Sequence, residues 1–483
     1  MATIRNRVTA CKAAPTEEVT TCFSKATITR SLSKSSPSFQ FLCRQFHKPR
    51  DSLLSQPEGL ITLRGFANFT VVLLVLFNLK LALYNISRAF AYCQLTTWLL
   101  YVLADTASIP PLLAAACLPV AVCAALQAEK LLERKKVGTK TFMAVIGANL
   151  AVLIVAPPLF LLIPVRTNLV ASIACIWLTI TVWLKLVSYH MVNWSSRREH
   201  LSEHKTGNGN VSSAEKDGAV SQKANGAAAN GHISNLVVYP DNLYAADIWY
   251  FMLAPTLCYE INFPQRPKIR KWFLFWITLE VIIIPLLGMT LLNQWALPIM
   301  AVTAKAYNEM DMWELFKAYI DLVVWNTVFW IMMSFWLFHS TLNWLGEVLR
   351  FADRDFYRDW WNADSVRSFW NRWNLPVHRW CWRHIYNPLV SAGFTKFQAQ
   401  MAVFGVSAVF HEYIMSLPLK KVYGVAFAGM AIQLPLFYLY DNVIHERFPK
   451  IGNGLIVVLF IFVMPLVVIL YYCKYFSIII GGQ

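Results

Sequence analysis

The sequence predicts an all-α, polytopic membrane protein. Of its 483 residues, 57% are hydrophobic and 14% are charged, which is too apolar for a soluble chain of this length. About nine stretches are long and apolar enough to cross a bilayer as helices. Several of them contain prolines, which indicates kinked helices packed on neighbours, because backbone groups freed inside lipid must find partners.

The candidate spans fall into three groups along the chain. Four of them precede a polar segment and cover residues 66–84, 110–126, 142–163 and 168–187. Two follow that segment at residues 272–292 and 322–338, and the remaining three lie at residues 398–417, 422–440 and 455–472. The stretch between the second and third groups is rich in aromatic and basic residues, which predicts interfacial helices.

Two segments outside the spans are expected to be flexible. Residues 1–65 are basic and predict a largely disordered cytoplasmic tail ahead of a membrane domain at residues 66–483. The second segment lies at about residues 195–240, where residues 205–236 are rich in Gly, Asn, Ser and Ala. That composition is typical of a flexible linker, here a cytoplasmic loop.

The distribution of basic residues predicts the orientation of the chain. The formal net charge is +16, which in a soluble protein would suggest nucleic acid as a partner. If the N-terminus is cytoplasmic, the cytoplasmic segments hold 34 of the 43 Lys and Arg residues and the opposite side holds 7. The positive-inside rule therefore explains the charge without nucleic acid. An odd number of spans then places the C-terminus in the lumen.

Cysteine and histidine spacing argues against a metal centre or a disulfide framework. The ten cysteines include no CxxC pair, and Cys117, Cys123 and Cys175 fall within spans. His200 and His204 form one HxxxH pattern, but it borders the flexible loop and has no companion pair. We expect no metal ion and no cofactor.

One histidine lies at membrane depth. His411 and Glu412 occur in the apolar run "AVFGVSAVFHEYIMSLPL", about 20 Å beyond its cytoplasmic end at 1.5 Å per residue. A neutral buried imidazole is suited to act as a general base toward an alcohol. The alternative is a neutral histidine that bonds another helix. Glu412 points about 100° away from His411, so we expect it to bond a different helix.

The segment before this helix combines aromatic and basic side chains. Residues 356–386 hold six of the 19 tryptophans and five arginines. One interpretation is an interfacial helix with an aromatic belt. The other is a binding face on which His378, Trp382 and Tyr386 recur every four residues. In that interpretation the face stacks an adenine, and Arg379 and Arg383 beside it pair phosphates.

Long motifs in fixed order carry a family resemblance. "FYRDWWN" at residue 356, "WNLPVHRW" at 373 and "FHEY" at 410 are preceded by "YPDNL" at 239, "MLAPTLCYEINFP" at 252 and "FWLFHSTLNWLGEVLRFADRD" at 335. From about residue 60 onward, the sequence resembles the acyl-CoA:diacylglycerol O-acyltransferase branch of the membrane-bound O-acyltransferase superfamily.

The resemblance implies roles for particular residues. It makes His411 the catalytic histidine, accompanied by Asn374, and makes Glu412 and Gln433 residues that line a reaction chamber. The acyl-CoA contacts it implies are Phe356, Tyr357, Arg358, Asp359, Trp360, Trp361, Asn362, Trp373, His378, Tyr386, Lys396 and Ser407. One departure is Met464 before Pro465 in the last span, where family members often have Gln.

The resemblance also implies a reaction and a setting. The fatty acyl group of acyl-CoA, a co-substrate, would pass to the free hydroxyl of diacylglycerol, giving triacylglycerol and CoA. The fold would be about nine spans around an internal chamber, in a homodimer of the endoplasmic reticulum membrane. Sterol or another lipid alcohol is the alternative acceptor; a transporter and a non-catalytic scaffold are alternatives from other classes.

Overall fold

The computed structural model confirms an all-α fold. It describes Pro49, Ser52 and residues 64–83, 104–164, 166–207, 237–440 and 452–481. Within these residues every named element is a helix, and the only strand-like pairing is an isolated bridge between Gln265 and Phe351. The tail at residues 1–65 and the loop at 208–236 lie almost entirely outside the described residues.

The first part of the chain forms a set of long helices. Pro119 stands in the first turn of α6, where the missing N–H costs no helical hydrogen bond, so α5 and α6 run nearly end to end. Prolines 157 and 158 lie inside α7, which continues through them. The helices are α3 (Arg64–Leu83), α5 (Ile109–Ala116), α6 (Leu118–Glu133), α7 (Thr139–Leu162) and α8 (Leu169–Gly207).

The middle part contains helices interrupted by π-helical turns. Asp311 begins α12 by accepting hydrogen bonds from two backbone N–H groups of its first turn. The elements are α9 (Ala245–Leu253), α10 (Lys271–Leu291), the π-turn η4 (Leu292–Ala296), α11 (Leu297–Asn308), α12 (Met312–Ser334), the π-turn η5 (Phe335–Thr341) and α13 (Leu342–Val348).

The last part alternates short helices with two long ones. Thr395 and Gln398 form a reciprocal capping box that begins α17. The elements are η6 (Trp360–Asn362), α14 (Val366–Trp373), α15 (Leu375–Cys381), the π-turn η7 (Trp382–Tyr386), α16 (Asn387–Ser391), α17 (Lys396–Ser416), α18 (Val425–Ala431), α19 (Gln433–Leu439) and α21 (Gly452–Gly481).

Each of the nine predicted spans is helical over most of its length, but the number of membrane crossings is not confirmed. Among the described residues, five helical stretches are long and apolar enough to cross a membrane: Thr106–Glu133, Thr139–Leu162, Leu169–Glu203, Lys271–Met289 and Met312–Val348. Two further apolar stretches are shorter, Val425–Leu436 and Gly452–Val467. The long helix α17 is not among the five; its Gln400, His411 and Glu412 reduce its hydropathy.

The structure moves two predicted boundaries. Helix α8 continues to Gly207, so residues 195–207, which were predicted to lie in the flexible loop, are helical. Its last turns stay helical because Arg197 is fixed there: the guanidinium bonds Glu129 of α6 and the hydroxyl of Tyr239. Helix α12 begins ten residues before the predicted span at 322.

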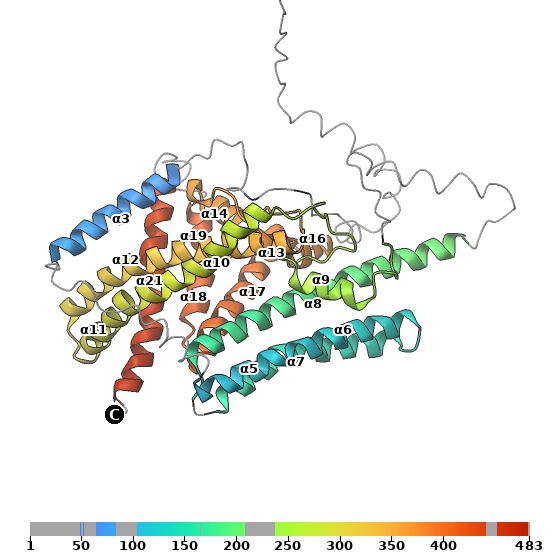
Figure 1. Cartoon of the computed structure of the whole chain (residues 1–483), viewed down its shortest axis with the longest axis horizontal. Helices are drawn as coiled ribbons and strands as arrows, with labels where there is room; N and C mark the ends of the chain where they lie inside the picture. The colour runs from blue at the N-terminus through green and yellow to red at the C-terminus, as the bar shows by residue number, and fades with distance from the viewer. Residues whose placement is uncertain are drawn as a thin grey trace, which may run out of the picture.

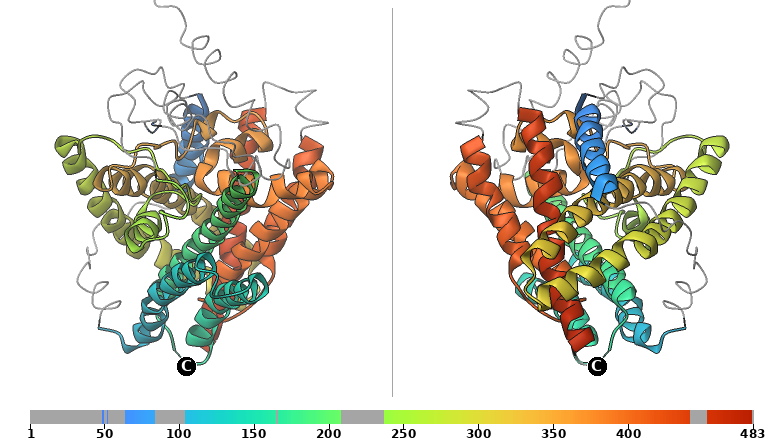
Figure 2. Two further views of the ribbon diagram at one scale, coloured as in Figure 1. Left: turned by 90° about the vertical axis from the view of Figure 1, so that its right-hand side faces the viewer. Right: turned by 90° about the vertical axis from the view of Figure 1, so that its left-hand side faces the viewer.

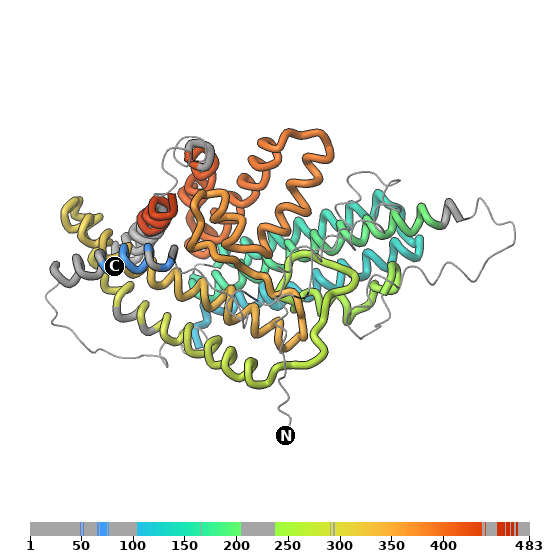
Figure 3. Tube along the Cα trace, turned by 90° about the horizontal axis from the view of Figure 1, so that it is seen from above, coloured from blue at the N-terminus to red at the C-terminus, as the bar shows by residue number. Residues whose placement is uncertain are grey.

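Helices lie on both sides of α12. Figure 1 shows α10, α11, α12 and α21 grouped at one end of the molecule and α5 to α8 at the other. Helices α17 and α18 run side by side, coloured orange in Figure 2. Seen from above in Figure 3, α10 follows one edge and α17 and α18 lie toward the opposite edge, with α12 between them.

Candidate active site

His411 is held by its own helix. Its Nδ1 lies 2.7 Å from the backbone carbonyl oxygen of Ser407, one turn earlier on α17, and 3.4 Å from the hydroxyl of the same residue. A carbonyl oxygen only accepts hydrogen bonds, so Nδ1 carries the proton. Nε2 is then an unprotonated acceptor. The His411 side chain is exposed rather than packed into the helix bundle.

Neighbouring side chains fasten α17 to the α7 and α8 pair. The ring of Phe410 meets Trp183 of α8 with 5.4 Å between centroids. Tyr413 donates a 2.6 Å hydrogen bond to the carbonyl of Ile154 in α7. The position of His411 is therefore set by contacts on both sides of it in the sequence.

Glu412 bonds other helices, as its direction on the helix predicts. Its carboxylate accepts hydrogen bonds from the backbone N–H groups of Gly424 at 2.8 Å and Phe427 at 3.1 Å, which begin α18, and from the Tyr471 hydroxyl of α21 at 2.7 Å. Gly424 has φ +72°, a conformation that favours glycine. Glu412 thus joins α17, α18 and α21, and its place in a chamber wall stays a prediction.

Asn374 links two short helices. Its side-chain oxygen accepts a hydrogen bond from the backbone N–H of Val377 at 3.2 Å and so caps α15. In the part of the chain that the structure describes, no hydrogen bond joins Asn374 to His411, and the amide nitrogen of Asn374 has no partner. Its catalytic role stays a prediction.

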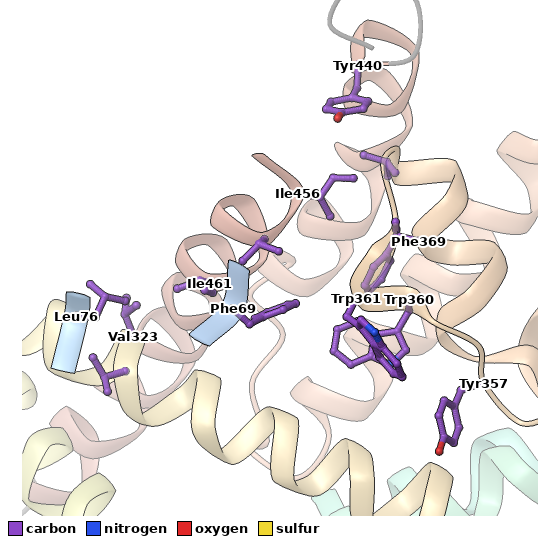
Figure 4. Packing of buried hydrophobic residues seen from close by; sticks show 14 of the residues in the cluster. Phe69, Leu76, Val323, Tyr357, Trp360, Trp361, Phe369, Tyr440, Ile456 and Ile461 are labelled. Carbon is purple, nitrogen blue, oxygen red and sulfur yellow. The ribbon is translucent and has the colours of Figure 1, made fainter. Parts of the chain in front are cut away.

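The aromatic residues of "FYRDWWN" belong to a buried core, and Figure 4 labels three of them, Tyr357, Trp360 and Trp361. Phe356, Tyr357, Trp360 and Trp361 are at most 7% exposed. Trp361 packs on Phe66 of α3 with 4.5 Å between centroids. In this arrangement the four rings pack against the protein itself, so any acyl-CoA contact they make stays a prediction.

The polar residues of the same motif hold the loop in place. Asn362 accepts a 2.7 Å hydrogen bond from the backbone N–H of Gly65, where α3 begins. Asp359 lies 3.5 Å from the guanidinium of Arg372. Arg358 pairs with Asp355 at 3.0 Å and is the most exposed charged member. Direct contact with a bound anion is open mainly to Arg358.

The predicted phosphate-pairing arginines are engaged elsewhere. Arg383 is 2% exposed and donates to the carbonyl of Tyr259 at 3.1 Å. Arg379 pairs with Asp355 at 2.7 Å and with Asp353 at 3.4 Å. Arg383 lies in the π-turn η7, which replaces the regular helix expected there, whereas Arg379 lies before it in α15. The adenine and phosphate contacts of this face stay a prediction.

His378 remains half-buried beside this charge network. Burial lowers the pKa of His378, and the nearby guanidinium groups of Arg379 and Arg358 lower it further. His378 is therefore neutral near pH 7 in the structure without ligand. A bound anion would reduce the repulsion from the two arginines.

The other predicted site residues lie on several elements. Trp373 stacks on Trp330 of α12 with 4.6 Å between ring centroids. Gln433 accepts a 3.1 Å hydrogen bond from the indole N–H of Trp370 and so joins α19 to α14. Lys396 is exposed at the start of α17, and Tyr386 ends η7 half-buried. Of the predicted set, the structure places Ser407 in direct contact with His411.

His339 is a buried histidine next to the "FYRDWWN" motif that the sequence analysis did not single out. Its Nδ1 lies 2.8 Å from the hydroxyl of Tyr357, so η5 is joined to the "FYRDWWN" motif. The sequence contained a sign of this buried histidine, because His339 directly follows an apolar run. Among the described residues, no group of three His, Cys, Asp or Glu side chains is placed to hold a metal ion.

The fold and the site together define a class of protein. A family model for membrane-bound O-acyltransferases matches residues 167–474, which hold His411, Asn374 and the "FYRDWWN" motif. The chain belongs to the membrane-bound O-acyltransferase family. This agrees with the long apolar helices and confirms a membrane protein.

Particular relatives narrow the comparison. The chain is 35% identical over 431 residues to "Diacylglycerol O-acyltransferase 1" of Bos taurus, covering 89% of this chain and 84% of that protein. It is 36% identical over 434 residues to the Homo sapiens protein of the same name, with the same coverage. It is 29% identical over 422 residues to "Diacylglycerol O-acyltransferase 1C" of Glycine max, covering 84% and 74%.

Proposed function

We propose that this protein transfers a fatty acyl group from acyl-CoA to the free hydroxyl of diacylglycerol, giving triacylglycerol and CoA. The family and the names of the relatives support the reaction. The observation that carries the mechanism is the 2.7 Å contact between Nδ1 of His411 and the Ser407 carbonyl, because it leaves Nε2 free to accept a proton.

The reaction is a direct transfer. Nε2 of His411 takes the proton of the diacylglycerol hydroxyl as its oxygen attacks the thioester carbonyl carbon. The C–S bond then breaks, and the CoA sulfur leaves with the proton returned from His411. A positioned base of this kind contributes about 10²- to 10⁴-fold in rate. The protein supplies no acyl-enzyme nucleophile in this scheme.

Asn374 supplies a hydrogen-bond donor in the proposal. Its oxygen is engaged in capping α15, which orients the side chain, while its amide N–H groups have no partner among the described residues. A donor aimed at developing negative charge stabilises the tetrahedral transition state. Asn374 would therefore stabilise the oxyanion formed from the thioester carbonyl.

The proposal also assigns the setting. Acyl-CoA is the co-substrate and meets the cytoplasmic side near Arg358, His378 and Lys396, while diacylglycerol comes from the membrane. The protein lies in the endoplasmic reticulum membrane with a cytoplasmic N-terminus, a lumenal C-terminus and an internal chamber. The family resemblance implies a homodimer, which light scattering on the purified protein measures.

Replacing His411 tests the mechanism. In microsomes, His411→Ala should reduce labelled triacylglycerol formation from oleoyl-CoA at least about 10²-fold, because the base is lost. His200→Ala, at a histidine near the end of α8, serves as the matched control and should retain activity. Equal expression and an unchanged elution profile show that both variants fold. Undiminished product in folded His411→Ala would sink the assignment of His411.

A further inference from the structure

Two adjacent prolines inside α7 change its backbone hydrogen bonds. Pro157 and Pro158 stand four residues after Leu153 and Ile154 in the same helix. In a regular α-helix the N–H of each residue bonds the carbonyl four residues earlier. Proline has no N–H, and its ring crowds that carbonyl. The carbonyls of Leu153 and Ile154 therefore lose their regular donors, and Pro158 pushes the Ile154 carbonyl aside.

Tyr413 of α17 bonds one of these two carbonyls. Its hydroxyl donates a 2.6 Å hydrogen bond to the carbonyl oxygen of Ile154, although the two residues are 259 positions apart in the chain. A backbone acceptor that is shielded from water costs free energy without a donor. Tyr413 supplies the donor that Pro158 lacks, so Pro158 determines where on α7 this bond forms.

The bond fixes the register of α17 against α7. Phe410, Tyr413 and Leu417 recur at spacings of three and four residues and pack on a buried cluster that includes Leu161 of α7 and Leu184 of α8. Apolar packing is non-directional, so it tolerates small shifts along the helix. A hydrogen bond weakens steeply when its distance and angle change. The bond from Tyr413 therefore opposes sliding and rotation of α17 that the apolar contacts permit.

This anchored face lies opposite His411. Successive residues of a helix are about 100° apart, so the side chain of Tyr413 points about 200° from that of His411. The His411 ring bonds the Ser407 carbonyl of its own helix at 2.7 Å, and its side chain is exposed. The ring consequently moves with α17, and whatever holds the back of α17 sets the place of Nε2.

We propose that Tyr413 is a positioning residue for acyl transfer and that Pro158 creates the acceptor it requires. The inference rests on the proposed function of His411. Tyr413 acts through α17 and touches no reacting atom. A displacement of about 1 Å can lower the rate of a positioned reaction on the order of 10²-fold. A smaller shift of Nε2, left when the hydroxyl bond is lost, should lower the rate about 10-fold.

Tyr413→Phe removes the hydroxyl alone. In purified full-length protein, kcat for triacylglycerol formation from oleoyl-CoA should fall about 10-fold, while the KM values for oleoyl-CoA and diacylglycerol stay within about 2-fold. Tyr319→Phe is the matched control, because the Tyr319 hydroxyl donates an equal 2.6 Å bond to the carbonyl of Phe462 and joins α12 to α21. The control should lose a similar amount of Tm and keep the wild-type kcat.

The two prolines provide a second matched pair. Pro158→Ala restores a backbone N–H, which draws the Ile154 carbonyl back into α7 and away from Tyr413, so kcat should fall at least about 3-fold. Pro157→Ala makes the same change one residue earlier, restores the donor of Leu153 and should keep the wild-type kcat. The double variant Tyr413→Phe, Pro158→Ala should match Tyr413→Phe alone, because the carbonyl direction no longer matters without the hydroxyl.

Four results would overturn the proposal: an unchanged kcat in folded Tyr413→Phe, an equal loss of kcat in Tyr319→Phe, equal effects of Pro158→Ala and Pro157→Ala, or multiplied losses in the double variant. If Tyr413→Phe fails to fold, the two proline variants decide. A normal rate in His411→Ala would remove the base on which the inference rests. A reduced rate in His411→Ala with a normal rate in Tyr413→Phe would overturn the positioning role alone.

Discussion

At the scale of single residues, His384 is held in an unfavourable setting for a positive charge. It is 7% exposed, and both ring nitrogens lack a hydrogen-bond partner. Trp380 packs beside it with 5.4 Å between ring centroids. Burial lowers the pKa of His384 well below its usual value, and the charge of Arg383 lowers it further.

The consequence is a loss of stability in mild acid. In the unfolded chain a histidine takes up a proton as the pH falls through about 6.5. The native ring resists protonation until a much lower pH, so the unfolded state binds more protons. The free energy of unfolding therefore falls as the pH falls below about 6.5, by at most about 1.4 kcal/mol per pH unit for this group.

Thermal unfolding in detergent between pH 7.5 and 5 measures this effect. His384→Phe keeps a ring against Trp380 and removes the titration, so its Tm should fall less steeply than that of wild type below pH 6.5. An identical pH dependence in wild type and His384→Phe would show that His384 is not the group responsible.

For single residues, some contacts were predictable from the sequence and others were not. Helical geometry predicted that Glu412 bonds another helix, which the structure confirms, whereas the membrane depth of His411 stays a prediction. The sequence did not predict that Nδ1 of His411 would donate its proton to the Ser407 carbonyl, since side-chain rotamers depend on packing. One of the two interpretations of the sequence gave Arg383 as a phosphate partner; in the structure its guanidinium is buried and donates to the Tyr259 carbonyl.

At the scale of elements, Lys185 joins two helices. The ammonium group on α8 donates to the carbonyls of Phe251, Met252 and Ala254 at 2.9, 2.8 and 2.7 Å. These carbonyls lie at the C-terminal end of α9, where a helix leaves acceptors without internal partners. All three donors of the ammonium are satisfied, so a positive charge is tolerated within α8.

Removing this charge should loosen the α9 segment. Lys185→Met leaves three carbonyls without their donor, at about 1–3 kcal/mol for each acceptor that stays buried. We expect the free energy of unfolding to fall by at least about 2 kcal/mol, measured by thermal unfolding in detergent. Lys305→Met is the matched control, because Lys305 is exposed and lies 3.9 Å from Glu309. Equal shifts in both variants would contradict this role.

Element boundaries were less predictable than element type. Every span predicted from hydropathy is helical over most of its length, because burial in lipid requires long apolar runs. Hydropathy underestimated α8 because the turns after residue 187 are polar and are stabilised by Glu129 and Tyr239. No predicted span covers α11, which follows α10 directly through the π-turn η4.

At the scale of the whole molecule, charge distribution predicts how the chain sits in the membrane. Basic residues are concentrated in segments that share one side if the spans alternate. The five long apolar helices agree with a multi-pass protein but do not fix the number of crossings. Hydropathy counts fail where polar residues enter a helix, and α17 is such a helix.

A glycosylation tag tests the orientation. A tag with an N-x-Ser/Thr acceptor fused to the C-terminus should receive glycan in the endoplasmic reticulum, and the same tag at the N-terminus should not. The readout is an endoglycosidase-sensitive shift on a gel. Glycan on the N-terminal tag would reverse the orientation, and glycan at neither end would indicate an even number of crossings.

The contact between His411 and Ser407 has one last consequence. The acceptor that fixes the imidazole tautomer is a backbone carbonyl, which every amino acid provides at that position. Chain geometry, and not the identity of a neighbouring side chain, thus readies the ring for proton transfer. Selection at residue 407 is free to act on other properties, such as room for a thioester, without disturbing the protonation of the base.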